Sequence, residues 1–240
     1  MTLALLQTII QSVSSTLYWI GLSAGIRALP GERSRRRRWM IGSAVALAVW
    51  LVAIVLAAGN GFLDGGGRPP PVIAALGATL VAGYLLLLSG TFRAIIARIP
   101  PHWLIAIQTS RILGGVFLVR YFEGQLPGAF AIPVGVGDVL TGLFAPLVAY
   151  WWVSGKPYAR RAAIAWNLFG MADLINAVLI GVLTGGAGGG IVFPLVLIPA
   201  YAVPRAFLLH SYSLIGLLRS ASQARAPADR LPAELEGARA

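Results

Sequence analysis

Long runs of apolar residues, separated by short polar segments, dominate the chain. Each run approaches the ~20 residues that a helix needs to cross about 30 Å of hydrocarbon. Open strands cannot satisfy their backbone groups in lipid, so runs of this length predict helices. The pattern therefore predicts an all-α polytopic membrane protein with seven transmembrane helices, at residues 3–27, 39–59, 71–92, 103–121, 132–153, 160–184 and 191–218.

Basic residues in the connecting segments predict the orientation. Most of the 19 Lys and Arg residues fall on one side of the predicted spans, and only Arg68 and Arg120 fall on the other. Positively charged loops stay in the cytoplasm, so the N-terminus is predicted outside and the C-terminus in the cytoplasm. Residues 1–219 are expected to form one transmembrane domain, and the charged, proline-containing residues 220–240 a disordered cytoplasmic tail.

The composition supports the membrane class. The chain is 58% hydrophobic and 11% charged, against about 25% charged in an ordinary soluble domain. Its net charge of +11 comes from arginines in short loops and the tail, which leaves no basic surface with interleaved aromatics for nucleic acid. The absence of cysteine excludes disulfides and thiolate chemistry. Abundant Arg, Ala and Gly favour a bacterial protein, located as a multi-pass protein in the inner (cytoplasmic) membrane.

Four ionisable side chains fall deep inside predicted spans: Arg111, Asp138, Asp173 and Arg205. A charge at the bilayer centre costs at least ~2.5–3.5 kcal/mol, so each of them needs a partner, a proton or water. Because the charges balance, we expect two buried ion pairs or one four-membered network. Polar neighbours on the same helices complete the candidate site: Gln108, Asn167, Asn176 and Tyr201.

Both aspartates lie in a repeated pattern. Residues 135–143 and 170–178 each read Gly, any residue, small, Asp, two aliphatics, short polar, small, aliphatic. The fifth and sixth predicted helices run in opposite directions, so the repeat predicts an inverted arrangement with both carboxylates near the bundle axis. Its small residues allow close helix approach.

Prolines predict broken helices in two spans. The fifth span is expected to begin with a broken or re-entrant turn near Pro133 and to bend at Pro146, and the seventh carries Pro194, Pro199 and Pro204. A proline inside a helix removes a backbone donor, and the freed carbonyl at membrane depth requires protein or water around it. Broken helices of this kind form substrate and ion sites in transporters.

The first span carries a polar stripe. Its members are Gln7, Gln11, Ser14 and Tyr18, which are three or four residues apart and therefore share a face. Such a face is expected to point at other helices, where it either hydrogen-bonds them together or lines a pathway.

Two family resemblances can be tested against the sequence. Residues 135–138, Gly-Val-Gly-Asp, resemble the Gly-x-Gly-Asp motif of intramembrane aspartyl proteases, the presenilin and prepilin-peptidase group. In that group the second catalytic Asp precedes the motif, whereas Asp173 follows it, so no catalytic role is transferred. Seven helices with an outer N-terminus also resemble microbial rhodopsins. Retinal would need a lysine in the last helix, and the chain has only Lys156, in a loop.

The leading interpretation is a small membrane transporter or channel, with Asp138 and Asp173 as proton or cation sites and the two embedded arginines as counter-charges. One alternative is a non-catalytic membrane subunit of a larger complex, associated with a pigment, a quinone or a haem held by His102 and His210. A third is an intramembrane aspartyl-type hydrolase, although an enzyme is the less favoured class. The sequence does not identify a cofactor. Expected partners are membrane lipid and other membrane subunits or a second copy, and not nucleic acid.

Overall fold

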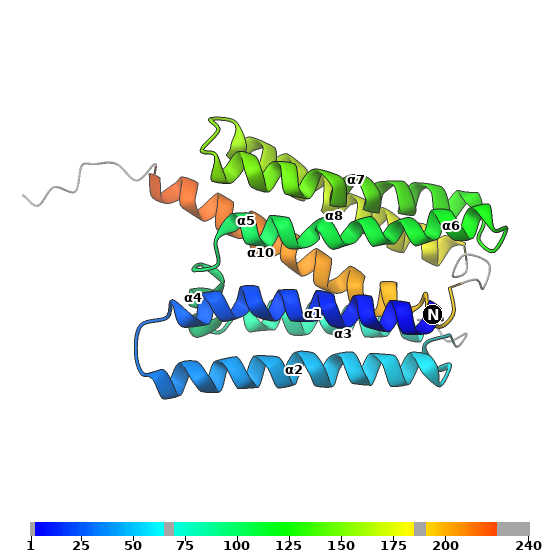
Figure 1. The fold of residues 1–240 in the computed structure, drawn as a ribbon, viewed down its shortest axis with the longest axis horizontal. Coiled ribbons are helices and arrows are strands. Elements are labelled where there is room, and N and C mark those ends of the chain that lie inside the picture. Colours follow the sequence, from blue (N-terminus) through cyan, green and yellow to red (C-terminus); the bar gives the residue numbers. More distant parts are fainter. Residues whose placement is uncertain (1–2, 65–69, 185–190, 225–240) are drawn as a thin grey trace, which may run out of the picture.

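The computed structural model describes residues 3–64, 70–184 and 191–224, and over these residues it is all-helical, with no strand. The helices lie roughly alongside one another as an elongated bundle (Figure 1). Five are long and apolar enough to cross a membrane, and a sixth span is obtained when the bent pair α3 and α4 is counted as one. The prediction of an all-α protein with membrane-spanning helices is thus confirmed.

The elements follow one another along the chain with short connections. In order they are α1 (Leu3–Arg27), α2 (Arg33–Gly59), the 3-10 turn η1 (Phe62–Asp64), α3 (Pro71–Leu86), α4 (Gly90–Ile96), α5 (Pro101–Ala106), the 3-10 segment η2 (Ile107–Gly115), α6 (Val116–Phe122), α7 (Gly128–Val153), α8 (Ala159–Leu183), the π-helical turn η3 (Ile198–Ala202) and α10 (Val203–Ala224).

The second and third predicted spans differ from the helices observed at their start and end, respectively. The second starts at Arg33, not at residue 39, because the arginine run forms the first turns of α2. The third was predicted to continue to residue 92, but α3 ends at Leu86 and the chain bends by 97° into α4. Ser89 stabilises this bend, because its hydroxyl accepts a hydrogen bond from the backbone N–H of Phe92 at 3.3 Å and so caps α4.

The predicted break at the start of the fifth span is wrong. Helix α7 is continuous, with Pro133 and Pro146 inside it. Neighbouring helices can cover the carbonyl that a proline frees, and Gly142, four residues before Pro146, packs directly against the backbone of Ile112 in η2. The break lies instead in the fourth span, where the 3-10 segment η2 interrupts the helix between α5 and α6.

The seventh span is irregular where its prolines indicated. The π-helical turn η3 contains Pro199, and α10 begins at Val203, one residue before Pro204. Helix α10 runs to Ala224, past Ser220, where the tail was predicted to begin. The rest of the predicted tail, residues 225–240, lies outside the described residues.

Helices α7 and α8 pack against each other on the side of the bundle opposite α2 (Figure 1), and they contact η2, α5 and α10. Apolar side chains pack on both sides of the polar centre described below. On one side Phe117 and Phe130 meet edge to face, with ring centroids 5.4 Å apart. On the other, Ile105, Trp166 and Leu217 are buried together. Apolar layers therefore lie on both sides of the polar centre.

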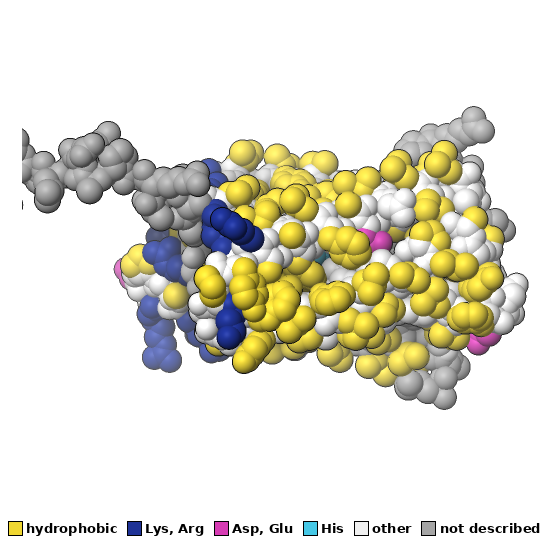
Figure 2. Space-filling model, turned by 90° about the horizontal axis from the view of Figure 1, so that it is seen from above, with side chains coloured by type: hydrophobic (Ala, Val, Ile, Leu, Met, Phe, Trp, Pro, Cys, Tyr) yellow, Lys and Arg dark blue, Asp and Glu magenta, His cyan; other side chains and the backbone are white. Residues whose placement is uncertain are grey.

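Basic side chains gather at one end of the molecule, while apolar side chains cover much of the rest of the face seen in Figure 2. This end holds the α1–α2 and α7–α8 loops and the C-terminal part of α10 (Figure 1). The segregation of charge matches the pattern from which the orientation was predicted.

Candidate functional site

Arg111 is the centre of a buried ion-pair cluster. It lies on η2, and its side chain is 5% exposed. Oδ1 of Asp138, from α7, lies 2.7 Å from both Nε and Nη2 of Arg111. Oδ2 of Asp173, from α8, accepts a hydrogen bond from Nη2. One guanidinium therefore binds both aspartates of the sequence repeat.

Close packing holds the carboxylates in place. A Cβ atom at Gly137 would overlap the Asp173 carboxylate, and one at Gly114 would overlap that of Asp138. A Cβ at Gly170 would overlap the imidazole of His210 and lie 3.1 Å from Nη1 of Arg111. The backbones of η2, α7 and α8 can approach the cluster this closely only because these positions carry no side chain.

A second branch of hydrogen bonds leads from Arg111 to α10. Nη1 of Arg111 donates to the carbonyl of Gly170 at 3.1 Å and lies 3.2 Å from Nε2 of His210. Arginine has no acceptor, so Nε2 must be the unprotonated nitrogen of the ring. The other ring nitrogen, Nδ1, then carries the hydrogen and donates to Oδ1 of Asn167 at 3.0 Å. His210 is thus a neutral imidazole fixed in one tautomer.

Asn167 and Trp166 complete this branch. Nδ2 of Asn167 donates to the carbonyl of Ala163 at 2.8 Å and to the hydroxyl of Ser213 at 3.1 Å. The Trp166 ring lies against the His210 ring, with centroids 4.8 Å apart, and its Nε1 donates to the carbonyl of Thr141 at 3.0 Å. Both nitrogens of His210 therefore have hydrogen-bond partners, which leaves neither for the haem that was one of the alternatives.

Arg205 does not join the cluster, so the predicted two pairs or four-membered network is wrong. On α10, its Nη1 donates to the Ser15 hydroxyl at 2.8 Å and its Nη2 to Oε1 of Gln11 at 2.7 Å. Its Nε donates to the carbonyl of Tyr201 at 3.1 Å, and the rings of Tyr18 and Tyr201 lie 4.7 and 3.8 Å from the guanidinium. Within the described residues its partners are neutral oxygens and aromatic faces.

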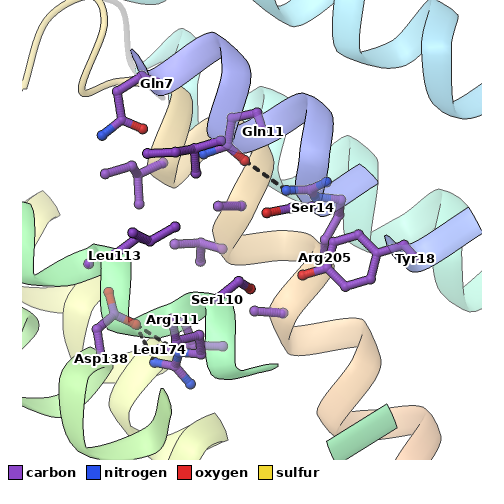
Figure 3. A pocket seen from close by; sticks show the side chains of 16 residues that line it. Gln7, Gln11, Ser14, Tyr18, Ser110, Arg111, Leu113, Asp138, Leu174 and Arg205 are labelled. Carbon is purple, nitrogen blue, oxygen red and sulfur yellow. Dashed lines mark hydrogen bonds and ion pairs between the residues drawn. The ribbon is translucent and has the colours of Figure 1, made fainter. Parts of the chain in front are cut away.

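A cavity of about 50 Å³ separates the two arginines. At ~10–15 Å³ per water it has room for about three to five water molecules. Asp138 and Arg111 line one wall, Arg205 and Gln11 the other, and Gln7 closes the end nearest the N-terminus of α1 (Figure 3). The polar stripe of α1 thus faces this cavity, and its Gln11 accepts a hydrogen bond from Arg205 on α10.

The remaining predicted site residues divide into three cases. Gln108 is fully buried and donates to the carbonyl of Ala206 at 2.9 Å, which ties η2 to α10, and its Oε1 has no partner among the described residues. Tyr201 belongs to the Arg205 centre. Asn176 is exposed on α8 and lies apart from both centres.

Sequence reasoning missed the positions of His210 and Trp166. His210 was considered only as a haem ligand, and Trp166 was not considered. No local pattern indicates either role, because both depend on which face of α10 packs against α8. Around the cluster, the described residues contain no group of three or more His, Asp or Glu side chains that could hold a metal ion.

Comparison with known proteins adds a family but no activity. The model of the family described as a domain of unknown function (DUF8737) matches residues 69–218. No curated protein and no solved structure matches the chain. The matched region contains all four embedded charges and the cluster around Arg111. Helices α1 and α2 precede it, so the Gln11 and Ser15 oxygens that bind Arg205 come from outside that region.

Proposed function

The chain belongs to the DUF8737 family, whose description states no activity, and we propose from the site itself that it is a small membrane transporter or channel for protons or small cations. The observation that carries the proposal is one guanidinium shared by two buried carboxylates, at the edge of a water-sized polar cavity. Ionisable residues at membrane depth are costly, and they commonly mark ion and proton pathways.

The charges of the cluster favour a cation as the transported species. Arg111 contributes one positive charge, Asp138 and Asp173 contribute two negative charges when both are ionised, and His210 is neutral. One negative charge is therefore left without a partner inside the cluster. A proton on one carboxylate or a small cation beside it removes this imbalance. Asp138 lines the cavity and is the carboxylate that we assign to bind it.

The irregular backbone supports movement at the same place. The 3-10 segment η2 carries Arg111, and the π-helical turn η3 lies directly before the helix that carries Arg205. Non-α stretches inside helices often mark hinges and functional sites, and transporters build their ion sites on interrupted helices. Both arginines that face the cavity are thus attached to segments whose hydrogen bonds can rearrange.

The proposal includes the full topology. Counting α3 and α4 as one span and α10 as the last gives seven spans, with the N-terminus outside and the C-terminus in the cytoplasm. The basic end of the molecule then faces the cytoplasm, here in the inner membrane of a bacterium. The cavity and the cluster lie between the two ends, near the middle of α7 and α8.

Flux measurement in reconstituted vesicles tests the function. The purified protein is placed in vesicles that contain a pH-sensitive dye, and a potassium gradient with valinomycin imposes a membrane potential. We expect proton entry above that of empty vesicles, and its loss on Asp138→Asn. Glu123→Gln is the matched control, because Glu123 forms an exposed ion pair with Arg120, away from the cavity. Sodium and potassium fluxes are measured separately, with dyes selective for each ion and without valinomycin in the potassium assay.

Two outcomes would contradict the proposal. Flux of every tested ion equal to that of empty vesicles would remove it and favour a non-catalytic subunit, in which case other membrane subunits should copurify. Flux that Asp138→Asn leaves unchanged would remove the role of the carboxylate. An aspartyl hydrolase is not supported by the geometry, because Arg111 pairs with both aspartates, whereas such enzymes require two carboxyl groups that share a proton directly.

A further inference from the structure

A second hollow lies on the other side of Arg205 from the polar cavity. It has a volume of about 580 Å³, and α1, α2, α3, α5 and α10 contribute to its walls. Leu47 and Trp50 from α2 form one wall, and Leu208 and Tyr212 from α10 lie opposite. Nearly all of its lining is apolar, and its size falls within the ~300–1,000 Å³ typical of small-molecule sites. We call it the lateral groove.

The lateral groove opens sideways, between α2 and α3. Ala46 on α2 and Ala78, Ala82 and Leu86 on α3 line it and are exposed. In Figure 1, α2 lies at the edge of the bundle, alongside α1 and α3. In a membrane this mouth faces lipid, so a molecule dissolved in the bilayer can enter without crossing water.

Arg205 supplies a positive charge at the inner end of the groove. It is 8% exposed and forms no ion pair within the described residues. Three of its five N–H groups donate to Ser15, Gln11 and Tyr201, so two remain, one on each terminal nitrogen. A buried cation held only by neutral acceptors is a strong binder of an incoming anion, because pairing removes an uncompensated charge.

Trp50 supplies a second unused donor. Its indole Nε1 is buried and has no hydrogen-bond partner among the described residues, although the ring lines the groove. Indole nitrogens in membrane proteins usually find an acceptor when buried. The lateral groove thus combines an apolar body with a cation that has no anionic partner among the described residues and with a buried indole N–H in its wall.

We propose that the lateral groove binds a single-chain amphiphilic anion from the bilayer, a long-chain carboxylate, whose acid group pairs with Arg205. The hydrocarbon chain of the ligand lies among the apolar side chains between α2 and α3. Its carboxylate oxygens accept hydrogen bonds from the free N–H groups of Arg205. The charge of Arg205 favours an anion over a neutral lipid. This site shares Arg205 and Tyr18 with the lining of the cavity of the cation pathway proposed above, but the rest of its lining is different, and it requires no transport.

Binding of oleate to the detergent-solubilised protein tests the proposal. Radiolabelled oleate should bind saturably, above the amount that enters empty micelles, and oleyl alcohol of the same chain length should compete at least about tenfold more weakly because it lacks the charge. Arg205→Gln should reduce oleate affinity by a similar factor. Trp50→Phe, which removes only the N–H, should reduce it by a smaller factor.

Two further variants keep the test decisive if Arg205→Gln does not fold. Ala82→Trp fills the mouth of the groove and should abolish saturable binding, whereas Val81→Trp, at an exposed neighbouring position outside the groove, should leave it intact. The proposal is overturned if oleate and oleyl alcohol bind equally, if Ala82→Trp binds like the unmodified chain, or if no saturable binding occurs. Vesicle flux measured on Ala82→Trp separates the two proposals, since the cation pathway should survive this change.

Discussion

Arg111 binds groups from three different helices: a carboxylate on α7, a carboxylate and a carbonyl on α8, and an imidazole on α10. A guanidinium can do this because its five donors point outward in one plane, whereas the compact ammonium of a lysine could not reach all four acceptors. The position of Arg111 therefore fixes the mutual geometry of these helices. Its removal would leave two carboxylates buried without a cation.

The first residue-scale prediction concerns this removal. Arg111→Met should destabilise the protein by about 3–5 kcal/mol, because breaking a buried ion pair leaves unpaired charge behind. The triple change Arg111→Met, Asp138→Asn and Asp173→Asn should recover much of this loss, since no charge then remains. Thermal unfolding in detergent measures both. Arg120→Met, in the exposed pair with Glu123, should cost no more than about 1 kcal/mol. Equal losses for Arg111→Met and Arg120→Met would contradict the prediction.

The sequence was sufficient to locate the four embedded charges but not to pair them. The depth of a charged residue in the membrane and the sign of its charge are properties of a single helix, and both can be read from the sequence. Pairing depends on which faces meet. Arg205 binds neutral oxygens on α1, at Gln11 and Ser15, although the balance of charges predicted an aspartate as its partner. Asn176 was predicted as a polar neighbour on the same helix as Asp173, yet it is exposed on α8.

At the scale of elements, the main error concerned which helix is broken. A proline inside a helix lacks the backbone N–H that would donate to the preceding turn. Helix α7 nevertheless stays helical through Pro133 and Pro146. The chain departs from α-helical geometry in η2, which contains no proline. There the backbone packs against α7 at Gly142 and turns Arg111 toward two aspartates. Tertiary contacts, not local propensity, set this irregular stretch.

The distance between α7 and α8 yields an element-scale prediction. Gly137→Ala places a methyl group where the Asp173 carboxylate lies, so the helices must separate or Asp173 must leave Arg111. We expect a loss of about 1–3 kcal/mol in thermal stability together with loss of flux. Gly77→Ala on α3 is the matched control, because no atom lies within 4 Å of its added Cβ, and it should be neutral or stabilising by up to ~1 kcal/mol. Similar behaviour of the two variants would show that close approach at Gly137 is not needed.

For the whole molecule, composition alone indicated a bundle of membrane-spanning helices, because hydropathy over ~20 residues reports directly on the lipid environment. The number of spans is harder to derive. The bent pair α3 and α4 changes direction within one apolar run, and α10 combines apolar residues with Arg205, His210 and several hydroxyls. Such segments are stabilised by the protein around them, so hydropathy underestimates them. The proposed topology therefore needs a test that does not depend on hydropathy.

The absence of cysteine provides that test, since a single introduced cysteine has no background. Asn60 and Ser154 are exposed in the α2–α3 and α7–α8 connections, which the seven-span topology places outside and in the cytoplasm, respectively. In spheroplasts, whose inner membrane is intact, a membrane-impermeant maleimide should label Asn60→Cys at once and Ser154→Cys only after permeabilisation. The reverse pattern would invert the orientation. Labelling of both from the same side would mean that an even number of spans separates them. In that case α3 with α4 does not cross the membrane, and the count of seven spans on which the proposed topology depends is wrong.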